Sequence, residues 1–304
     1  MPIVELENVR KAYDSKVAVH GLSIKIEPGT MFGLLGPNGS GKTSSIRMMI
    51  GITVPDSGTV SLFNQPFERK LLNRVGYLPE ERGLYKKMKV IEQLVFLGQL
   101  HGLDAATALK RSHAWCERME ITEAIPKKTE ELSKGMQQKI QFIAALLHEP
   151  DLIIMDEPFS GLDPVNATLL QDTLVDLRKE GKAILFSTHR MDQVEKLCDN
   201  IALISGGKLV LSGGMREVKS RYPRNRVQIT FEGSDAFLQH PAIAEAKNYS
   251  GQAEIKLRPS ADNEADAQAI LAQAITMARI SRFEVMEPTL EEIFIEAVGG
   301  KVDA

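Results

Sequence analysis

The octapeptide at residues 36–43 constrains the fold more than any other stretch of this chain. It fits the pattern G-x-x-x-x-G-K-[ST] and lies between the apolar run 31–35, which predicts a buried strand, and the segment 44–50, which predicts the start of a helix. Backbone N–H groups of such a loop point inward, and the positive end of the helix dipole adds to their attraction for phosphate oxygens. We therefore expect a phosphate-binding loop made of Gly36, Pro37, Asn38, Gly39, Ser40, Gly41, Lys42 and Thr43.

Two side chains at the end of this loop have distinct expected roles. Lys42 would reach the β- and γ-phosphates of a nucleotide, and the Thr43 hydroxyl would hold Mg²⁺. A glycine turn with an unrelated lysine is the alternative, but the strand–loop–helix context disfavours it. The motif predicts a nucleoside triphosphatase without saying which class.

A second motif is the apolar run 152–155, which ends in the carboxylates Asp156 and Glu157. Ligands of parallel sheets bind at the carboxyl ends of the strands, so Asp156 is placed to hold Mg²⁺, directly or through water. Glu157 is placed to polarise an attacking water. An ordinary strand end followed by an acidic turn remains the alternative when this motif is taken alone.

Composition and charge describe an ordinary globular chain. Of 304 residues, 43% are hydrophobic and 25% are charged, and the formal net charge of −3 argues against a dedicated nucleic-acid binder. Cys116 and Cys198 are far apart and show no metal spacing, so we expect two buried thiols in a reducing compartment. The first residues do not resemble a signal peptide, and no apolar window is long enough to span a bilayer.

The hydrophobic periodicity divides the chain into two parts. Alternation over residues 2–30 predicts antiparallel strands, and helical spacing marks residues 84–130. The apolar runs 152–155, 183–186 and 201–204, with helical stretches predicted at 139–147, 167–179 and 191–198, indicate a parallel sheet. Residues 220–226 resemble a linker whose arginines we expect on the solvated surface. We expect a first domain at 1–220 with a helical insertion at about 84–135, and a small α+β domain at 221–304 whose strand and helix order suggests a ferredoxin-like fold.

Three further segments decide the family. Residues 132–138 (LSKGMQQ) precede the acidic strand, residues 160–163 (SGLD) follow it, and residues 187–189 (STH) end a later strand. In this order the five motifs closely resemble those of the ATP-binding cassette (ABC) family, over roughly residues 3–218. The resemblance implies the α/β fold class of a P-loop NTPase core with an antiparallel β subdomain and a helical insertion.

The resemblance also implies a homodimer that forms head to tail with two ATP molecules between the subunits. Ser133 and Gly135 of one subunit would then face the γ-phosphate held by the other, and Asp163 would contact the partner subunit. A hydroxyl, a close backbone approach and a helix N-terminus suit an anion at that place.

Within one subunit, the resemblance assigns three more residues. Tyr13 would stack on adenine, His189 would touch the γ-phosphate and Glu157, and Glu157 would act on the attacking water. A surface strand tyrosine and a structural histidine are the alternatives for the first two.

Two departures from the family pattern stand out. Lys134 and Met136 replace a glycine and a glutamine of the usual LSGGQ signature, and Glu80 replaces the glutamine that usually follows Tyr-x-Pro. We hypothesise that Glu80 offers an oxygen toward Mg²⁺ or its water and alters Mg²⁺ dependence or communication with the partner.

Residues 79–85 and 287–294 resemble the subgroup of drug, sodium and other export systems. This resemblance implies an ATP-hydrolysing subunit that powers export through a separate membrane-spanning permease, cytoplasmic and peripheral on the inner face of the cell membrane. A docking site near Leu84, Tyr85 and Met88 is one interpretation of that segment, and packing of the insertion onto the core is the other. A soluble mechanical ATPase acting on ribosomes or DNA and a nucleotide sensor without turnover are the rival functions.

Overall fold

The computed structural model describes residues 1–81, 83–260 and 262–298. The chain divides into two compact units, Met1–Met215 and Arg216–Ala304. Arg82, part of the segment 79–85 discussed above, lies outside the described residues. Across the described ranges, every helix is too short or too polar to cross a bilayer.

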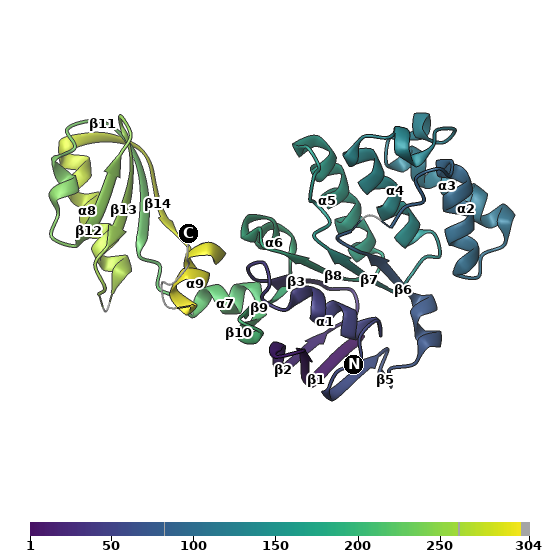
Figure 1. The fold of residues 1–304 in the computed structure, drawn as a ribbon. Coiled ribbons are helices and arrows are strands. Elements are labelled where there is room, and N and C mark those ends of the chain that lie inside the picture. The colour runs from purple at the N-terminus through teal and green to yellow at the C-terminus, as the bar shows by residue number, and fades with distance from the viewer. Residues whose placement is uncertain (82, 261, 299–304) are drawn as a thin grey trace. The chain divides into compact units, whose positions relative to one another are not determined.

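A mostly parallel sheet forms the centre of the first unit, with the strand order β10-β9-β3-β8-β7-β6 (Figure 1). The parallel strands are β9 (Asn200–Ser205), β3 (Met31–Leu35), β8 (Ala183–Thr188), β7 (Leu152–Asp156) and β6 (Val75–Leu78), while β10 (Lys208–Gly214) pairs antiparallel with β9. All residues of β3, β7 and β8 are buried, as expected when helices cover both faces of a parallel sheet. The predicted α/β class is confirmed.

An antiparallel subdomain packs on this sheet through α1 (Lys42–Met49). Its strand order is β2-β1-β4-β5, with β1 at Val4–Tyr13, β2 at Lys16–Ile26, β4 at Ser57–Leu62 and β5 at Gln65–Pro66. Ile46 and Met49 of α1 share one apolar core with Leu34 and Ile154 of the parallel sheet and Leu6 of β1. The helix that follows the phosphate loop is therefore held between two sheets.

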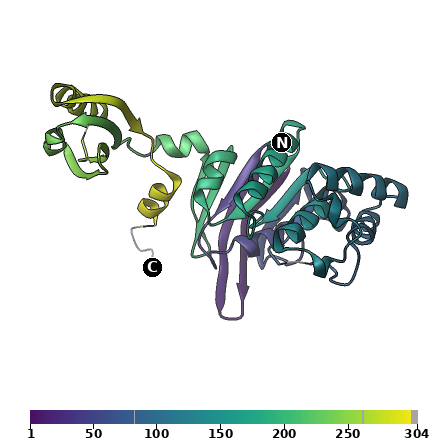
Figure 2. The ribbon, with the colours of Figure 1, turned by 90° about the horizontal axis from the view of Figure 1, so that it is seen from above.

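The remaining helices of the first unit are α2 (Val90–Leu100), α3 (Ala105–Arg118), α4 (Lys134–Leu146), α5 (Pro164–Lys179), α6 (Met191–Leu197) and, at the unit boundary, α7 (Met215–Ser220). Short 3₁₀ turns lie at Arg69–Arg74, Thr122–Ala124 and Thr129–Glu131. The helices α2 and α3 pair and lie beside α4, seen from two directions in Figures 1 and 2.

Periodicity placed the starts of α4 and α5 too late, at residues 139 and 167. Each helix begins directly after a capping side chain: Ser133 Oγ accepts from the Met136 N–H at 3.2 Å, and Asp163 Oδ1 accepts from the Asn166 N–H at 3.0 Å. Side-chain caps satisfy backbone donors in the polar first turn, where the hydrophobic pattern has not yet begun.

The second unit is a ferredoxin-like sheet. Its strands are β11 (Arg226–Gly233), β12 (Ile243–Asn248), β13 (Gln252–Leu257) and β14 (Ala278–Met286), in the order β12-β13-β11-β14 with antiparallel pairing throughout. A 3₁₀ turn at Ala236–Gln239 lies between β11 and β12, and α8 (Asn263–Met277) connects β13 to β14. Ile229, Phe231 and Ile255 of the sheet form its core with Ile270 of α8.

The helix α9 (Leu290–Ala297) ends the described part of this unit. Thr289 and Glu292 exchange side-chain to backbone hydrogen bonds at 2.9 and 3.3 Å, the capping box indicated by their spacing. The linker arginines are exposed as predicted, but each is also ion-paired: Arg221 with Glu217, Arg224 with Glu287 and Arg226 with Glu292.

Candidate functional site

The phosphate loop requires glycine at its two ends. Gly36 has φ +152°, and a Cβ there would lie 2.1 Å from the Ile204 carbonyl oxygen. Gly41 has φ +108°, and its Cβ would lie 2.5 Å from the Ala18 carbonyl oxygen. Both obstacles are backbone atoms, so a larger residue would have to displace β9 or β2. The backbones of β9 and β2 therefore leave no room for a side chain at either position.

A turn far away in the sequence fixes this loop in place. Gly207, in the hairpin between β9 and β10, donates its N–H to the Ser40 carbonyl at 2.9 Å and accepts from the His20 N–H at 2.8 Å. Gly206 and Gly207 both have positive φ, which glycine adopts at little cost. Sequence reasoning missed this contact, although the Gly-Gly pair between two apolar runs was its visible signal.

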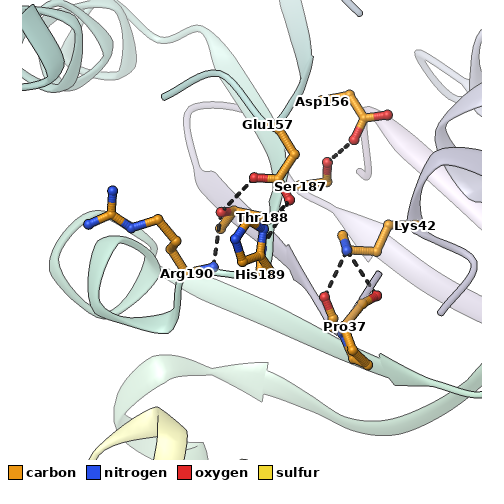
Figure 3. Close-up of polar contacts among 9 residues, drawn as sticks. Pro37, Lys42, Asp156, Glu157, Ser187, Thr188, His189 and Arg190 are labelled. Atoms are coloured by element: carbon orange, nitrogen blue, oxygen red, sulfur yellow. Dashed lines mark hydrogen bonds and ion pairs between the residues drawn. The ribbon is translucent and has the colours of Figure 1, made fainter. Parts of the chain in front are cut away.

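Lys42 begins α1 and reaches back over the loop. Its Nζ donates to the carbonyl oxygens of Gly36 at 2.7 Å and Pro37 at 3.2 Å (Figure 3). Burial lowers the pKa of Lys42, while the charges of Glu157, Asp156 and Glu80 act to raise it. The two carbonyls and the nearby carboxylates hold the Lys42 ammonium at the loop. In this position it can form charge-assisted hydrogen bonds to a phosphate group.

Asp156 lies at the end of β7 and is 1% exposed. Its Oδ1 accepts a short hydrogen bond from Ser187 Oγ at the end of β8, and its Oδ2 is buried with no partner among the described residues (Figure 3). A buried carboxylate oxygen without a donor is unfavourable unless a cation pairs with it. Nothing in the described ranges groups enough His, Cys, Asp or Glu side chains to form a complete metal cage. The site therefore suits Mg²⁺, which binds through one or two protein oxygens and shares substrate phosphates.

Glu157, directly after β7, has an unusual backbone conformation, and both of its carboxylate oxygens are hydrogen-bonded. Its φ is +48°, a left-handed conformation that costs a non-glycine residue energy and is found mostly at functional sites. Its Oε2 accepts from Thr188 Oγ1 at 3.1 Å, and its Oε1 accepts from the His189 N–H at 3.1 Å and contacts His189 Nδ1 at 2.9 Å. Figure 3 shows the carboxylate and the imidazole facing each other beside Lys42. The ends of β7 and β8 thus bring together an acid, a histidine and a lysine.

The residues assigned to the partner's phosphate lie on other segments. Ser133 and Asp163 are exposed caps of α4 and α5, and no hydrogen bond joins them or Gly135 to the phosphate loop within the described part of the chain. Hydrogen bonds from Asn166 lower the pKa of Asp163, so this carboxylate is charged at neutral pH. These residues do not complete the site of their own subunit.

Tyr13 and Glu80 are both exposed. Tyr13 ends β1 and is 41% exposed, which leaves its ring open to stacking. Glu80 is exposed in the bend after β6. Burial, with the charges of Asp156 and Glu80 adding to it, raises the pKa of Tyr77 to about 12. The charge of Glu80 therefore acts on the same two side chains, Tyr77 and Lys42, as the charge of Asp156 does.

Comparison with known proteins identifies the class. A family model described as ABC transporter matches residues 19–160, and a model of the C-terminal domain of DrrA1-3-like ATP-binding proteins matches residues 213–298. A solved structure titled as an ATP binding subunit of an ABC transporter matches with a TM-score of 0.67 and 27% identity, covering 72% of this chain and 92% of that one. The chain belongs to the ATP-binding proteins of ABC transporters, and it is an ATPase.

Relatives extend the match to the whole length. The uncharacterized ABC transporter ATP-binding protein YhaQ of Bacillus subtilis is 44% identical over 98% of this chain and 99% of its own. The linearmycin resistance ATP-binding protein LnrL of the same organism is 33% identical over 98% of both. A Nod factor export ATP-binding protein I of Cupriavidus metallidurans is 37% identical over 71% of this chain and 72% of its own.

Proposed function

We propose that this ATPase powers export through a separate membrane-spanning permease and works as an ATP-dependent homodimer. One observation carries the proposal: the carboxylate of Glu157 is held by Thr188 and His189 beside Lys42 and Asp156, the arrangement needed for turnover rather than for nucleotide sensing alone. The export direction rests on relatives named for linearmycin resistance and Nod factor export.

The residues of one subunit divide the work of hydrolysis. Loop N–H groups and Lys42 bind and orient the phosphates, while Thr43 and the free Oδ2 of Asp156 would hold Mg²⁺, which supplies positive charge to the phosphates when bound. Glu157 is placed to accept a hydrogen bond from the attacking water, and His189 keeps that carboxylate in position. Tyr13 offers an open ring to adenine.

Dimerisation follows from what each subunit leaves exposed. Ser133 and Asp163 lie at helix N-termini that face solvent, and a helix N-terminus attracts anions. A Cβ at Gly135 would meet Leu162 Cδ2 at 3.7 Å, an ordinary van der Waals distance, so the neighbouring atoms leave the Gly135 backbone accessible. We infer that these residues meet the γ-phosphate bound by a second copy, so that ATP joins the two cassettes.

An apolar groove provides a place for the permease. It has a volume of about 340 Å³ and runs between the core and the helical insertion, lined by Ile52, Tyr77, Leu84 and Leu97 among others. Ile52 is 63% exposed and Tyr85, edge-on to Phe96, is 54% exposed. We infer that a cytoplasmic segment of the permease binds here, which would place the chain in the cytoplasm, peripheral on the inner face of the membrane. Met88 is half-buried, as Leu84 is, and its N–H donates to the Tyr85 carbonyl.

The test separates hydrolysis, dimerisation and docking. Glu157→Gln should lower the ATPase rate by roughly 10²–10⁴-fold, the usual worth of a positioned acid or base, while Mg·ATP shifts this variant from monomer to dimer in analytical ultracentrifugation. Leu84→Ser with Tyr85→Ser should keep the basal ATPase rate but lose co-purification of the permease from solubilised membranes. A Glu157→Gln protein that stays monomeric both in solution and in its membrane assembly would refute the dimer. Co-purification of ribosomes or DNA in place of a membrane protein would favour the mechanical ATPase.

A further inference from the structure

Gln141 of α4 holds the loop that carries Glu80. Its Nε2 donates to the carbonyl oxygens of Pro79 at 3.3 Å and Glu81 at 3.1 Å, the two residues on either side of Glu80. The side chain is 5% exposed. Because both neighbours are carbonyls, which only accept, the amide rather than the oxygen must face them. A buried side chain therefore fixes the backbone of an otherwise irregular segment.

Gln141 is one of three glutamines with which α4 reaches separate loops. Gln137 donates to the carbonyl of Leu132, next to Ser133, at 3.0 Å, and Gln138 donates to the carbonyl of Pro158, next to Glu157, also at 3.0 Å. The same rigid helix thus ties the signature segment, the loop after Glu157 and the loop around Glu80 to one another. A displacement of the loop around Glu80 would change the contacts of α4, the helix that Ser133 caps.

The other end of the Gln141 carboxamide argues against a purely structural role. Its Oε1 is buried and has no hydrogen-bond partner within the described ranges. An unpaired buried acceptor destabilises a protein, and methionine of similar length would fill the place without that cost. Gln141 also lines the apolar groove together with Pro79 and Leu84, so it lies between the proposed permease site and Glu80.

We propose that Gln141 is a positioning residue for ATP hydrolysis, which sets the place of Glu80 at the Mg²⁺ end of the site and links it to α4. The inference rests on the proposed role of Glu80 near Mg²⁺ or its water. Gln141 itself touches neither nucleotide nor metal, and it acts through the backbone of residues 79–81.

Limited proteolysis of the nucleotide-free full chain tests the hold without any catalysis. A glutamate-specific protease cuts after Glu80 or Glu81 only when the backbone of residues 79–81 is released from Gln141. In Gln141→Met this cleavage should be about tenfold faster, the change expected when one to two hydrogen bonds of ordinary net strength are lost. Gln141→Glu, which places a carboxylate against two carbonyls, should be cut faster still. Gln137→Met is the matched control on the same helix and should leave the rate of this cleavage unchanged. Equal cleavage rates in wild type and Gln141→Met would overturn the inference.

A double-mutant cycle tests the link to the reaction. Gln141→Met should raise the Mg²⁺ concentration needed for half-maximal ATPase activity several-fold with little change in the KM for ATP, and this effect should vanish in a Glu80→Ala background. Additive effects of the two substitutions would show a merely structural glutamine and refute the inference. If Glu80→Ala alone leaves the Mg²⁺ dependence unchanged, the proposed role of Glu80 fails. If Glu80→Ala changes it but Gln141→Met does not, the assignment of Gln141 alone fails.

Discussion

Removing the Ser187 hydroxyl tests how much the partly unpaired Asp156 carboxylate destabilises the protein before a cation binds. Ser187 Oγ is the partner of Asp156 Oδ1, and Oδ2 has no partner within the described residues. In Ser187→Ala, a carboxylate that is 1% exposed would keep no donor among the described side chains. Leaving one buried polar group unsatisfied costs about 1–3 kcal/mol, and a charged group lies at or above the upper end. We expect a loss of about 2–4 kcal/mol in the free energy of unfolding.

Thermal unfolding, with and without ligand, measures this effect. For a unit of this size, each kcal/mol shifts Tm by about 2–4 °C, so Ser187→Ala should lower the Tm of the nucleotide-free protein by roughly 4–16 °C. Saturating Mg²⁺ with a non-hydrolysable ATP analogue should recover much of that loss, because the cation pairs with Asp156 in both proteins. The wild type should gain less from the same ligand than the variant does.

Ser112→Ala is the matched control. Ser112 is also buried, but its neutral hydroxyl donates to the Ala108 carbonyl of its own helix at 2.7 Å. Its loss should cost at most about 1 kcal/mol and show no dependence on Mg²⁺ or nucleotide. If Ser187→Ala shifts Tm no more than this control, or if the ligand does not narrow its deficit, the reasoning about an uncompensated Asp156 is wrong.

Three further predictions concern pH, the loop and the second unit. Burial lowers the pKa of His148 to about 4 against an ordinary value of 6.5. The unfolded chain therefore takes up this proton first as the pH falls, and the free energy of unfolding decreases between about pH 6.5 and pH 4. His148→Gln should remove roughly 1–2 kcal/mol of that decrease, after allowance for solvent screening, as measured by urea titrations at about pH 7.5 and about pH 5. An unchanged pH dependence would contradict it. Gly36→Ala should abolish binding of a fluorescent ATP analogue because the new Cβ would lie 2.1 Å from the Ile204 carbonyl oxygen. Gly39→Ala should weaken binding only moderately because no atom lies within 4 Å of its Cβ. Similar losses of affinity in both variants would refute the steric argument. Thr289→Ala should destabilise α9 by about 1 kcal/mol, seen as faster amide exchange in residues 290–297, and retained protection would show that packing rather than the cap holds the helix.

The nucleotide-binding part of the fold was predictable because its motifs carry their own geometry. The loop at 36–43 is typically preceded by a strand and followed by a helix, as it is here. The apolar runs at 152–155 and 183–186 predicted buried parallel strands, which the structure contains. Carboxyl ends of neighbouring parallel strands share one edge, which placed Asp156 and Glu157 at the ligand side of the sheet. The pairing of His189 with Glu157 came from the family resemblance, and the two side chains lie 2.9 Å apart in the structure.

Contacts between distant segments could not be predicted in the same way. Ser187, Gln138 and Gln141 act through hydrogen bonds to residues 20 to 62 positions away, and neither periodicity nor spacing encodes such pairs. Helix starts failed for a related reason, because a cap such as Ser133 lies in a polar stretch that resembles a loop. The linker arginines were recognised as exposed, but their acidic partners at Glu287 and Glu292 lie more than sixty residues further along the chain.

The hairpin between β9 and β10 is held by main-chain hydrogen bonds: the Gly207 N–H donates to the Ser40 carbonyl of the phosphate loop, and the Gly207 carbonyl accepts from the His20 N–H of β2. These main-chain hydrogen bonds do not depend on which side chains the two strands carry, but they do depend on the number of residues in the turn. Lengthening or shortening that turn by one residue should damage nucleotide affinity far more than most substitutions on the flanking strands. The hairpin should therefore tolerate changes of side chain but not changes in the number of residues in its turn.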